Sequence, residues 1–345
     1  HGRTNLDLFH WVKAREKLES YKLDDVAEHF LGEKKLEMDY KELFRMMDGT
    51  PDEIALVAKY CIQDCNLLVL LAERLQVYPS NVGMSRVTHT PMELLVTSGQ
   101  QIKVINQFVW HGHRMDARDA SGTGGYILNT PREHSGCETD NYDGATVIEP
   151  VTGYYTKPIA TLDFASLYPS IILANNFCFS TLVQNPEYQN VPGVTYVVIE
   201  VTPAKRYTWA VDMPGLTPNV LRYLLAARKK AKKKMAAAAA RGDAAQVDLA
   251  AAEAAGDADA AAAARARKTR AAQDKAVANA EQLALKVSAN SIYGFMGAVR
   301  TNWYRCLGVA DCVTYRAREM LHQTVQYVRE FAPCTVVYGD TDSVM

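Results

Sequence analysis

The sequence has few cysteines and no pattern that would pair them in a disulfide framework or a zinc site. There are 7 cysteines in 345 residues, an odd number, and none of them form a CxxC motif. Cys61 and Cys65 are spaced by one helical turn, but no second pair accompanies them. We therefore expect free, mostly buried thiols in a reducing compartment.

Long apolar runs and an excess of charge are also missing. The longest apolar runs, such as LLVLLA (67–72), are much shorter than the ~20 residues that span a bilayer. Nothing at the start resembles a signal peptide, so we expect a protein that is neither secreted nor bound to a membrane. The formal net charge of −1 argues against a uniformly basic surface for nucleic acid. With 48% hydrophobic and 22% charged residues, the composition is typical of two or three globular domains.

The first eighty residues are predicted to be helical. Apolar residues recur at helical spacing in residues 52–75, with acidic residues at the start of that segment. A shorter helix is expected in residues 20–34, where Gly32 would close it. Residues 91–110 also have helical spacing, and the polar, glycine-containing stretch 118–144 is predicted to be a loop. The His-Gly-His sequence at 111–113 is likewise expected in a loop.

The character of the sequence then changes twice. Strands are expected where β-branched residues gather between turn signals, in residues 145–155, 158–164 and 195–201. From Pro214 to about residue 285 the composition favours helix, and residues 235–280 are rich in alanine, which has high helix propensity but little apolar bulk. We predict a long antiparallel helical hairpin, mobile in its alanine-rich part, with breaks at 241–243 and 255–259.

Acidic residues follow two of the apolar segments. Asp163 comes after PIATL, and Asp340 and Asp342 come after CTVV. On an extended strand, residues i and i+2 face the same side, so Asp340 and Asp342 would repel one another unless a cation lies between them. These residues therefore predict either a solvated turn or half of a metal site. A phosphoryl-transfer site needs two divalent cations held by hard oxygen ligands, which three such carboxylates would supply.

Phosphoryl transfer also needs cationic groups, because it is catalysed largely by positioning and charge stabilisation. Residues 221–234 hold a run of Arg and Lys without one acid, in which Arg228 and Lys232 are one helical turn apart. A solvated helix face is the plain interpretation of such a run. Further along, four residues at helical spacing predict one polar helix face that also contains a lysine: Lys286, Asn290, Tyr293 and Gly294.

Three of these stretches resemble the polymerase motifs of one known family. DFASLYPSII (163–172), KVSANSIYG (286–294) and YGDTDS (338–343) are similar to motifs A, B and C of family B DNA polymerases, in the right order. The flanking GATVIEP and PGLTPNVLRYLLAARKKAK resemble the replicative delta-type enzymes and their relatives from large DNA viruses. YCIQDC (60–65) resembles the third exonuclease motif. One DxD alone is a weak signal, whereas three ordered motifs are specific.

The resemblance implies roles for individual residues. Asp163 and Asp342 would hold two Mg²⁺ ions together with the backbone carbonyl of Phe164, and Asp340 would support them. The other implied roles concern the incoming nucleotide, the template and the nuclease. Backbone N–H groups of Ser166, Leu167 and Tyr168 would face the triphosphate, and the Tyr168 ring would exclude a 2′-hydroxyl. The triphosphate would be bound by Arg228, Lys232 and Lys286, and the nucleotide would be held by Asn290. Tyr293 and Gly294 would shape the base-pair pocket, Tyr142 and Gly144 would contact the template, and Tyr60 and Asp64 would belong to a 3′–5′ proofreading nuclease.

The fold implied is of the α/β (α+β) class, with a mixed-sheet palm, a helical fingers hairpin and the C-terminal part of an RNase H-like exonuclease domain. The expected boundaries are 1–80 for the exonuclease part, 81–150 for a linker, 151–214 for palm with motif A, 215–297 for fingers and 298–345 for palm with motif C. The first two exonuclease motifs and a thumb are absent, so a partial sequence is expected, and the alanine-rich insertion makes the fingers longer than is usual in the family.

The expected activity is DNA-directed DNA synthesis in replication, with primer–template DNA and dNTPs as partners. A sliding clamp or accessory subunits would contact regions outside this sequence, and the protein would act in a nucleus or a viral replication compartment, with a large DNA virus as the favoured source. One alternative is a catalytically inactive polymerase-like DNA-binding scaffold, which would lack a metal carboxylate or alter the Lys/Asn helix. Another is reverse transcription, whose YxDD motif has adjacent acids, whereas Thr341 separates the two here.

Overall fold

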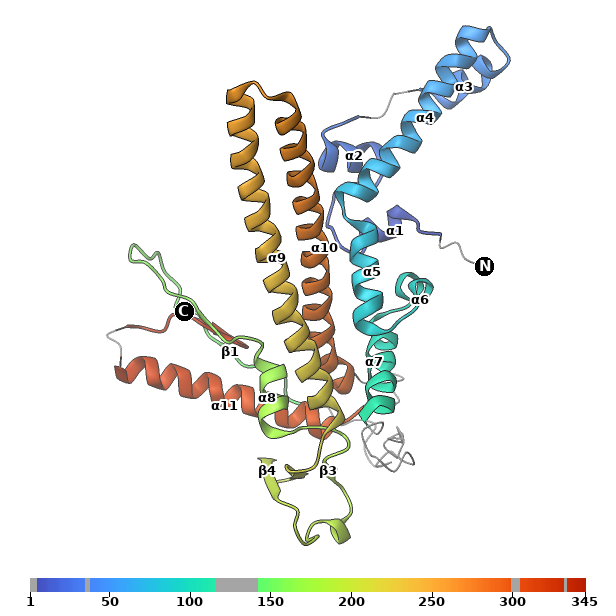
Figure 1. Cartoon of the computed structure of the whole chain (residues 1–345). Coiled ribbons are helices and arrows are strands. Elements are labelled where there is room, and N and C mark those ends of the chain that lie inside the picture. The colour runs from blue at the N-terminus through green and yellow to red at the C-terminus, as the bar shows by residue number, and fades with distance from the viewer. Residues whose placement is uncertain (1–4, 35–37, 116–141, 299–304, 332–333) are drawn as a thin grey trace. The chain divides into compact units, whose positions relative to one another are not determined.

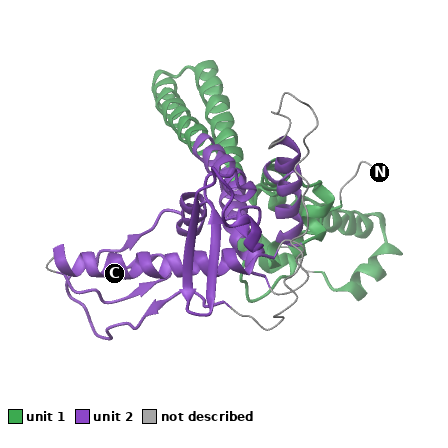
Figure 2. Ribbon diagram, turned by 90° about the horizontal axis from the view of Figure 1, so that it is seen from below, with its two compact units in different colours: residues 1–86, 90–98, 231–281 green, residues 87–89, 99–230, 282–345 purple. Residues whose placement is uncertain are grey.

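The structure is a computed structural model, and it describes residues 5–34, 38–115, 142–298, 305–331 and 334–345. The predicted loop at 118–144 lies almost wholly outside the described residues. The chain divides into two compact units (Figure 2), each described here by itself. The first comprises residues 1–86, 90–98 and 231–281, and the second comprises residues 87–89, 99–230 and 282–345. The helical hairpin is divided between the two units, and the predicted domain boundaries stay a prediction.

Helices make up the N-terminal part, as the sequence predicts (Figure 1). Two of the predicted ends are confirmed. Gly32 closes α2 in the left-handed conformation (φ 72°), and Thr50 and Glu53 form a reciprocal capping box at the start of α4. Trp11, Leu71 and Val77 are among the residues that form the buried cluster of this part. The helices are α1 (Leu8–Lys13), α2 (Leu23–Leu31), α3 (Tyr40–Met47), α4 (Pro51–Arg74), α5 (Val77–Thr88), α6 (Met92–Thr97) and α7 (Gln100–Met115).

Two predictions in this part are wrong. Residues 91–110 do not form one helix, because Ser98 and Gly99 separate α6 from α7. The His-Gly-His sequence is not a loop but part of α7, and His111 is buried there. Burial, with smaller contributions from His89 and Arg114, lowers the pKa of His111 to about 4. A buried neutral histidine is a packing residue, and local sequence gives no sign of that.

α4 is long and apolar enough to cross a membrane, judged by length and composition alone. This differs from the prediction based on uninterrupted runs, because residues 54–72 contain only two charged residues, Lys59 and Asp64, although they do not form one apolar run. A single helix of this kind is weak support for a membrane span, since the core helix of a soluble protein meets the same criteria.

The second unit contains two small sheets. The first has the strand order β1-β6-β7-β2 with antiparallel pairing throughout, and the second has the order β3-β5-β4. Only the strand predicted at 195–201 is realised at nearly full length; the strands within 145–155 and 158–164 shorten to two residues each. The strands are β1 (Val147–Ile148), β2 (Leu162–Asp163), β3 (Leu182–Val183), β4 (Tyr196–Thr202), β5 (Lys205–Ala210), β6 (Gly339–Asp340) and β7 (Ser343–Val344).

Helices hold these sheets in place. α8 (Leu167–Asn175) packs on α11 (Leu307–Phe331), and a short 3₁₀ helix, η1 (Pro186–Tyr188), connects β3 with β4. Val344 of β7 is buried against Leu321 and Val325 of α11. At the other sheet, Asp311 of α11 is 2% exposed and accepts hydrogen bonds from Lys205 (3.2 Å) and Tyr207 (2.6 Å). The packing of Val344 and the hydrogen bonds of Asp311 hold α11 against both sheets. They thereby also hold the β6–β7 hairpin in position.

The predicted helical hairpin is confirmed as α9 (Leu216–Ala255) and α10 (Ala258–Gly297), which run side by side (Figure 1). The predicted break at 255–259 is confirmed by the left-handed Gly256 (φ 70°), whereas the predicted break at 241–243 is wrong because α9 continues through it. Small buried side chains recur every seven residues on both helices. They are Ala231, Ala238, Ala245 and Ala252 on α9 and Ala264, Ala271 and Ala278 on α10.

Four ion pairs flank this alanine seam, and the first three of them recur at the same seven-residue interval. Lys234 pairs with Glu281 (3.3 Å), Arg241 with Asp274 (2.7 Å), Asp248 with Arg267 (2.9 Å) and Glu253 with Arg265 (2.6 Å). Exposed pairs of this kind contribute at most about 1 kcal/mol each, so their main effect is to fix the register of the helices. Small side chains let two helices approach closely without apolar bulk, so this alanine-rich segment can pack as a hairpin; its mobility stays a prediction.

This seam predicts a position-dependent effect of enlarging alanine. Ala238 is 1% exposed, whereas Ala240, two residues on, is exposed on the same helix. Ala238→Leu should force the helices apart and cost about 1–3 kcal/mol of local stability, while Ala240→Leu should be nearly neutral. Amide hydrogen exchange across residues 231–281 measures the difference. Equal protection in the two variants would show that the seam is not tightly packed.

Candidate active site

The first sheet brings two of the predicted carboxylates together. Asp163 of β2 stands opposite Ser343 of β7, and the next N–H, that of Phe164, donates to the carbonyl oxygen of Asp342 at 2.8 Å. Asp163 of β2 therefore lies close to Asp342, the residue directly before β7, although the two are far apart in the sequence. Antiparallel pairing of β2 with β7 is what places them side by side.

The electrostatics of Asp342 reflect this placement. Burial raises the pKa of its carboxyl, and the negative charge of Asp163 raises that pKa further, with a smaller contribution from Asp340. Ionising Asp342 beside Asp163 thus costs free energy that a bound cation would offset. The carboxylates of Asp163 and Asp342 and the carbonyl of Phe164 are the hard oxygen donors that Mg²⁺ prefers. Among the described residues, no group of three or more His, Cys, Asp or Glu side chains is arranged to hold a metal ion.

Asp340 has different surroundings. Its carboxylate accepts hydrogen bonds from the hydroxyls of Thr341 (2.8 Å) and Tyr338 (3.4 Å). The expectation that Asp340 and Asp342 face the same side of one strand is wrong. Thr341 has a left-handed conformation (φ 53°), and Thr341 and Asp342 form the turn between β6 and β7. The turn directs Asp342 toward Asp163 and leaves Asp340 in a neighbouring, hydrogen-bonded position.

The start of α8 lies directly after Asp163 and Phe164. Ser166 is its N-cap in a left-handed conformation (φ 57°), which a non-glycine residue rarely adopts. The first N–H groups of a helix have no partner within the helix, and the helix dipole is positive there. The N–H groups of Ser166, Leu167 and Tyr168 therefore stand at the start of α8, and their binding of a triphosphate stays a prediction.

The predicted polar face of α10 is present. Lys286, Asn290 and Gly294 are exposed and Tyr293 is half-buried, while residues on the opposite side of the same turns are buried. On α9, Arg228 is half-buried, and its Nε is buried with no hydrogen-bond partner among the described residues. An unpaired buried guanidinium N–H fits an anion. No hydrogen bond or ion pair in the described part of the chain joins Lys286 or Asn290 to the carboxylates.

Lys232 is exposed one turn beyond Arg228 on α9 and belongs to the first unit. Its place relative to the carboxylates stays a prediction.

Three tyrosines link these elements. The ring centroids of Tyr168 and Tyr293 are 4.4 Å apart, and those of Tyr142 and Tyr293 are 6.4 Å apart at nearly a right angle. Burial, followed by a hydrogen bond with Tyr142, raises the pKa of Tyr293. A Cβ on Gly297 would lie 2.7 Å from the Tyr142 hydroxyl oxygen, so a larger residue at the end of α10 would require the Tyr142 ring to shift.

Arg318 of α11 is a residue that sequence reasoning missed. Its guanidinium donates to the carbonyls of Asp143 (3.0 Å) and Gly144 (2.9 Å), which fixes the segment that carries Tyr142. Its positive charge also acts on Tyr168 and Tyr293. Nothing in TYRAR (314–318) distinguishes Arg318 from Arg316, which instead pairs with Glu319, so no local signal would have identified it.

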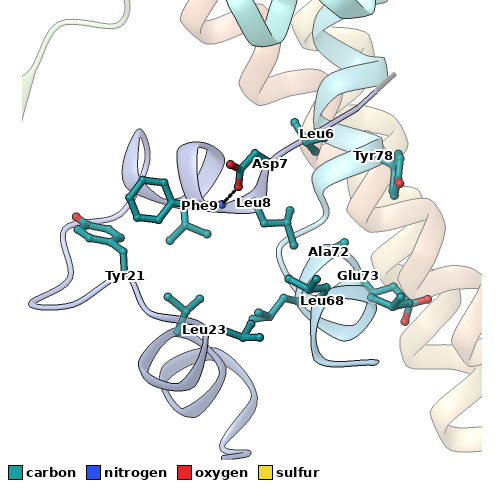
Figure 3. A pocket seen from close by; sticks show the side chains of 14 residues that line it. Leu6, Asp7, Leu8, Phe9, Tyr21, Leu23, Leu68, Ala72, Glu73 and Tyr78 are labelled. Carbon is teal, nitrogen blue, oxygen red and sulfur yellow. Dashed lines mark hydrogen bonds between the residues drawn. The ribbon is translucent and has the colours of Figure 1, made fainter. Parts of the chain in front are cut away.

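The predicted nuclease residues lie on α4. Tyr60 and Asp64 are one turn apart, as the spacing predicts, and both are half-buried. A cavity of about 570 Å³ lies in the same unit, and its mainly apolar lining comes mostly from α1, α2 and α4, with Tyr78 from α5 (Figure 3). Neither Tyr60 nor Asp64 lines this cavity. The cavity is therefore not the predicted nuclease site.

Comparison with known proteins agrees with this geometry. The family model described as DNA polymerase family B matches residues 90–251 and 260–345. The chain belongs to DNA polymerase family B. From residue 90 onward, the family model leaves out only the tip of the helical hairpin. The carboxylates, α8 and the polar face of α10 therefore all lie inside the matched residues.

Individual relatives extend the similarity to the first ninety residues. The DNA polymerase delta catalytic subunit of Candida albicans is 37% identical over the whole chain, and that of Mesocricetus auratus is 36% identical. The solved family B DNA polymerase of the archaeon Pyrobaculum calidifontis superposes with a TM-score of 0.63 at 25% identity, covering 99% of this chain and 38% of its own. The chain spans 30% and 28% of the length of the two delta subunits.

Proposed function

We propose that this chain carries the nucleotidyl-transfer site of a replicative DNA-directed DNA polymerase. The observation that carries the proposal is the placement of Asp163 beside Asp342, directly before the N-terminus of α8. The reaction is attack of a primer 3′-hydroxyl on the α-phosphate of a dNTP, with pyrophosphate as the leaving group. The tyrosine contacts and the polar face of α10 lie in the same unit as the carboxylates, where a base pair and a triphosphate would be received.

The carboxylates fit two Mg²⁺ ions. Asp163 and Asp342 would hold them with the carbonyl of Phe164, and Asp340, whose carboxylate is already hydrogen-bonded, would support the turn. When bound, the ions activate the primer hydroxyl and neutralise charge on the transferred phosphoryl group.

The chain's own residues bind and orient the nucleotide. The N–H groups at the start of α8 receive phosphate oxygens, and Arg228 and Lys286 supply positive charge to the triphosphate, with Lys232 proposed to join them. Asn290 holds the nucleotide. Tyr293 and Gly294 border the nascent base pair, Tyr168 lies under the sugar, and Tyr142 and Gly144 contact the template.

The wider assignment follows the relatives. We propose that primer–template DNA and dNTPs are the substrates, that accessory subunits bind elsewhere on the longer protein, and that Tyr60 and Asp64 serve a proofreading nuclease. The protein would act in the nucleus of a eukaryotic cell, because the similar delta subunits come from cellular organisms. A viral origin gains no support from them. The proposed domains remain those expected from the sequence.

Primer extension tests the proposal. The complete natural protein that contains this chain should add dNTPs to a primed template in the order the template dictates, and chelation of divalent cations should abolish the addition. An unprimed template of the same sequence is the control. Tight primer–template binding with no extension in the presence of Mg²⁺ would instead support a DNA-binding scaffold.

A further inference from the structure

α7 packs against the bases of both hairpin helices within the second unit. Its buried positions recur at helical spacing and include Val104, Gln107, Phe108 and His111. The Phe108 and Phe295 rings lie 6.0 Å apart, which joins α7 to α10. The His111 and Tyr223 rings lie 4.8 Å apart, which joins α7 to α9. α7 is thus positioned to set the orientation of the helices that carry Arg228 and Lys286.

Gln107 provides the polar contact in this packing. Its side chain is fully buried (0% exposed), and its Nε2 donates to the hydroxyl of Ser288 on α10 and to the carbonyl of Lys103 (3.2 Å). Its Oε1 is buried with no partner among the described residues. A buried amide with one unsatisfied atom costs free energy that an apolar side chain of similar shape would avoid. Stability alone therefore does not explain a glutamine here.

Ser288 lies between two proposed nucleotide-binding residues. Lys286 and Asn290 are exposed on α10, whereas Ser288 is 2% exposed. Successive residues turn by about 100° in a helix, so Ser288 points away from the face that holds Lys286 and Asn290. A hydrogen bond to Ser288 therefore restrains rotation of the turn of α10 that carries Lys286 and Asn290. Apolar packing permits small rotations that a directional bond resists.

We propose that Gln107 is a positioning residue for nucleotide binding, which acts through Ser288 to orient the face of α10 that carries Lys286 and Asn290. This rests on the proposed function. Gln107 lies outside the three polymerase motifs and its side chain is fully buried, so it would affect the reaction through the angle of α10. Loss of the bond should weaken dNTP binding and leave primer–template binding unchanged.

Gln107→Met tests this because methionine keeps the length and bulk of glutamine but cannot donate a hydrogen bond. The matched control is Gln101→Met, the same substitution at an exposed position of α7. In the complete natural protein, Gln107→Met should raise the KM for dNTP roughly fivefold to tenfold, the typical effect of one lost hydrogen bond that orients a binding group. The Kd for primer–template should stay unchanged, and Gln101→Met should match the wild type in both.

Ser288→Ala removes the same bond from the other side and leaves only a small gap. It should raise the KM for dNTP by a similar factor, and the double variant should show no further increase, because both changes break one interaction. Ser288→Ala also decides the question if Gln107→Met fails to fold.

Three outcomes would overturn the inference: a dNTP KM like that of the wild type in Ser288→Ala, effects that multiply in the double variant, or equal loss of dNTP and primer–template binding. Failure of the proposed function would look different, since the wild-type protein itself would then incorporate no dNTP.

Discussion

Asp342→Asn in the complete natural protein is expected to abolish primer extension, with a loss of at least about 10³-fold in kcat. Asparagine keeps the size of the side chain and the turn between β6 and β7, but it removes the negative charge beside Asp163. A neutral amide is a poor ligand for Mg²⁺, so the remaining donors would be Asp163 and the Phe164 carbonyl. Primer–template binding should persist, because it depends mainly on phosphate contacts made elsewhere.

The same substitution at two other aspartates serves as a comparison for Asp342→Asn. Asp243→Asn changes an exposed residue of the helical hairpin and should leave extension unchanged. Asp340→Asn should fall between the two, because the Asp340 carboxylate is held by Thr341 and Tyr338 beside the pair and not between the strands. Single-turnover extension and DNA binding by anisotropy measure the two properties separately. Ordinary extension by Asp342→Asn would refute the metal assignment, and simultaneous loss of DNA binding would point to a damaged fold.

Helices were predictable from the sequence where their ends carry local signals. The capping box of Thr50 and Glu53 and the left-handed Gly32 each involve residues within one turn, so the sequence contains the whole interaction. Alanine propensity likewise predicted α9 and α10. The continuous course of α9 through residues 241–243 was not predictable, because it depends on packing and an ion pair with α10.

Strands were less predictable because their hydrogen bonds are not local. Residues 145–155 and 158–164 have strand composition, yet only two residues of each pair with the short β6–β7 hairpin. His111 shows the same limit for helices: this polar residue of the His-Gly-His sequence is buried, and Tyr223 of α9 packs against it. Tertiary packing overrides local preference in both cases.

The residues of the candidate site also differ in whether local sequence indicates them. Ordered motifs predicted roles for Asp163, Asp342 and the face of α10, since each motif is a short continuous segment. Arg318 and Gln107 act on residues far away in the sequence, on the carbonyls of Asp143 and Gly144 and on Ser288 respectively. Their neighbours in sequence give no indication of these contacts. The residues proposed to bind substrate could therefore be named from the sequence, whereas the residues proposed to position them required the structure.

Tyr168→Ala is expected to relax discrimination against ribonucleotides by roughly 10²-fold, the scale on which a steric or polar mismatch in a pocket separates two substrates. Tyr168 is at the start of α8, and its ring lies 4.4 Å from that of Tyr293. Contact with Tyr293 restricts the ring, so it cannot turn aside for a 2′-hydroxyl without losing packing. Alanine removes the ring and keeps the N–H group of residue 168 at the start of the helix. The kcat/KM for dNTP should therefore fall much less than that for rNTP rises.

Tyr154→Ala is the matched control, because Tyr154 is 94% exposed and the substitution is the same. Its ratio of kcat/KM for dNTP and rNTP should equal that of the wild type. Tyr168→Phe separates the ring from the hydroxyl: it keeps the steric barrier and should keep the selectivity. Unchanged selectivity in Tyr168→Ala would contradict the role of the ring. Relaxed selectivity in both Tyr168→Ala and Tyr168→Phe would assign discrimination to the hydroxyl instead, since that group is the only feature that the two variants both lack.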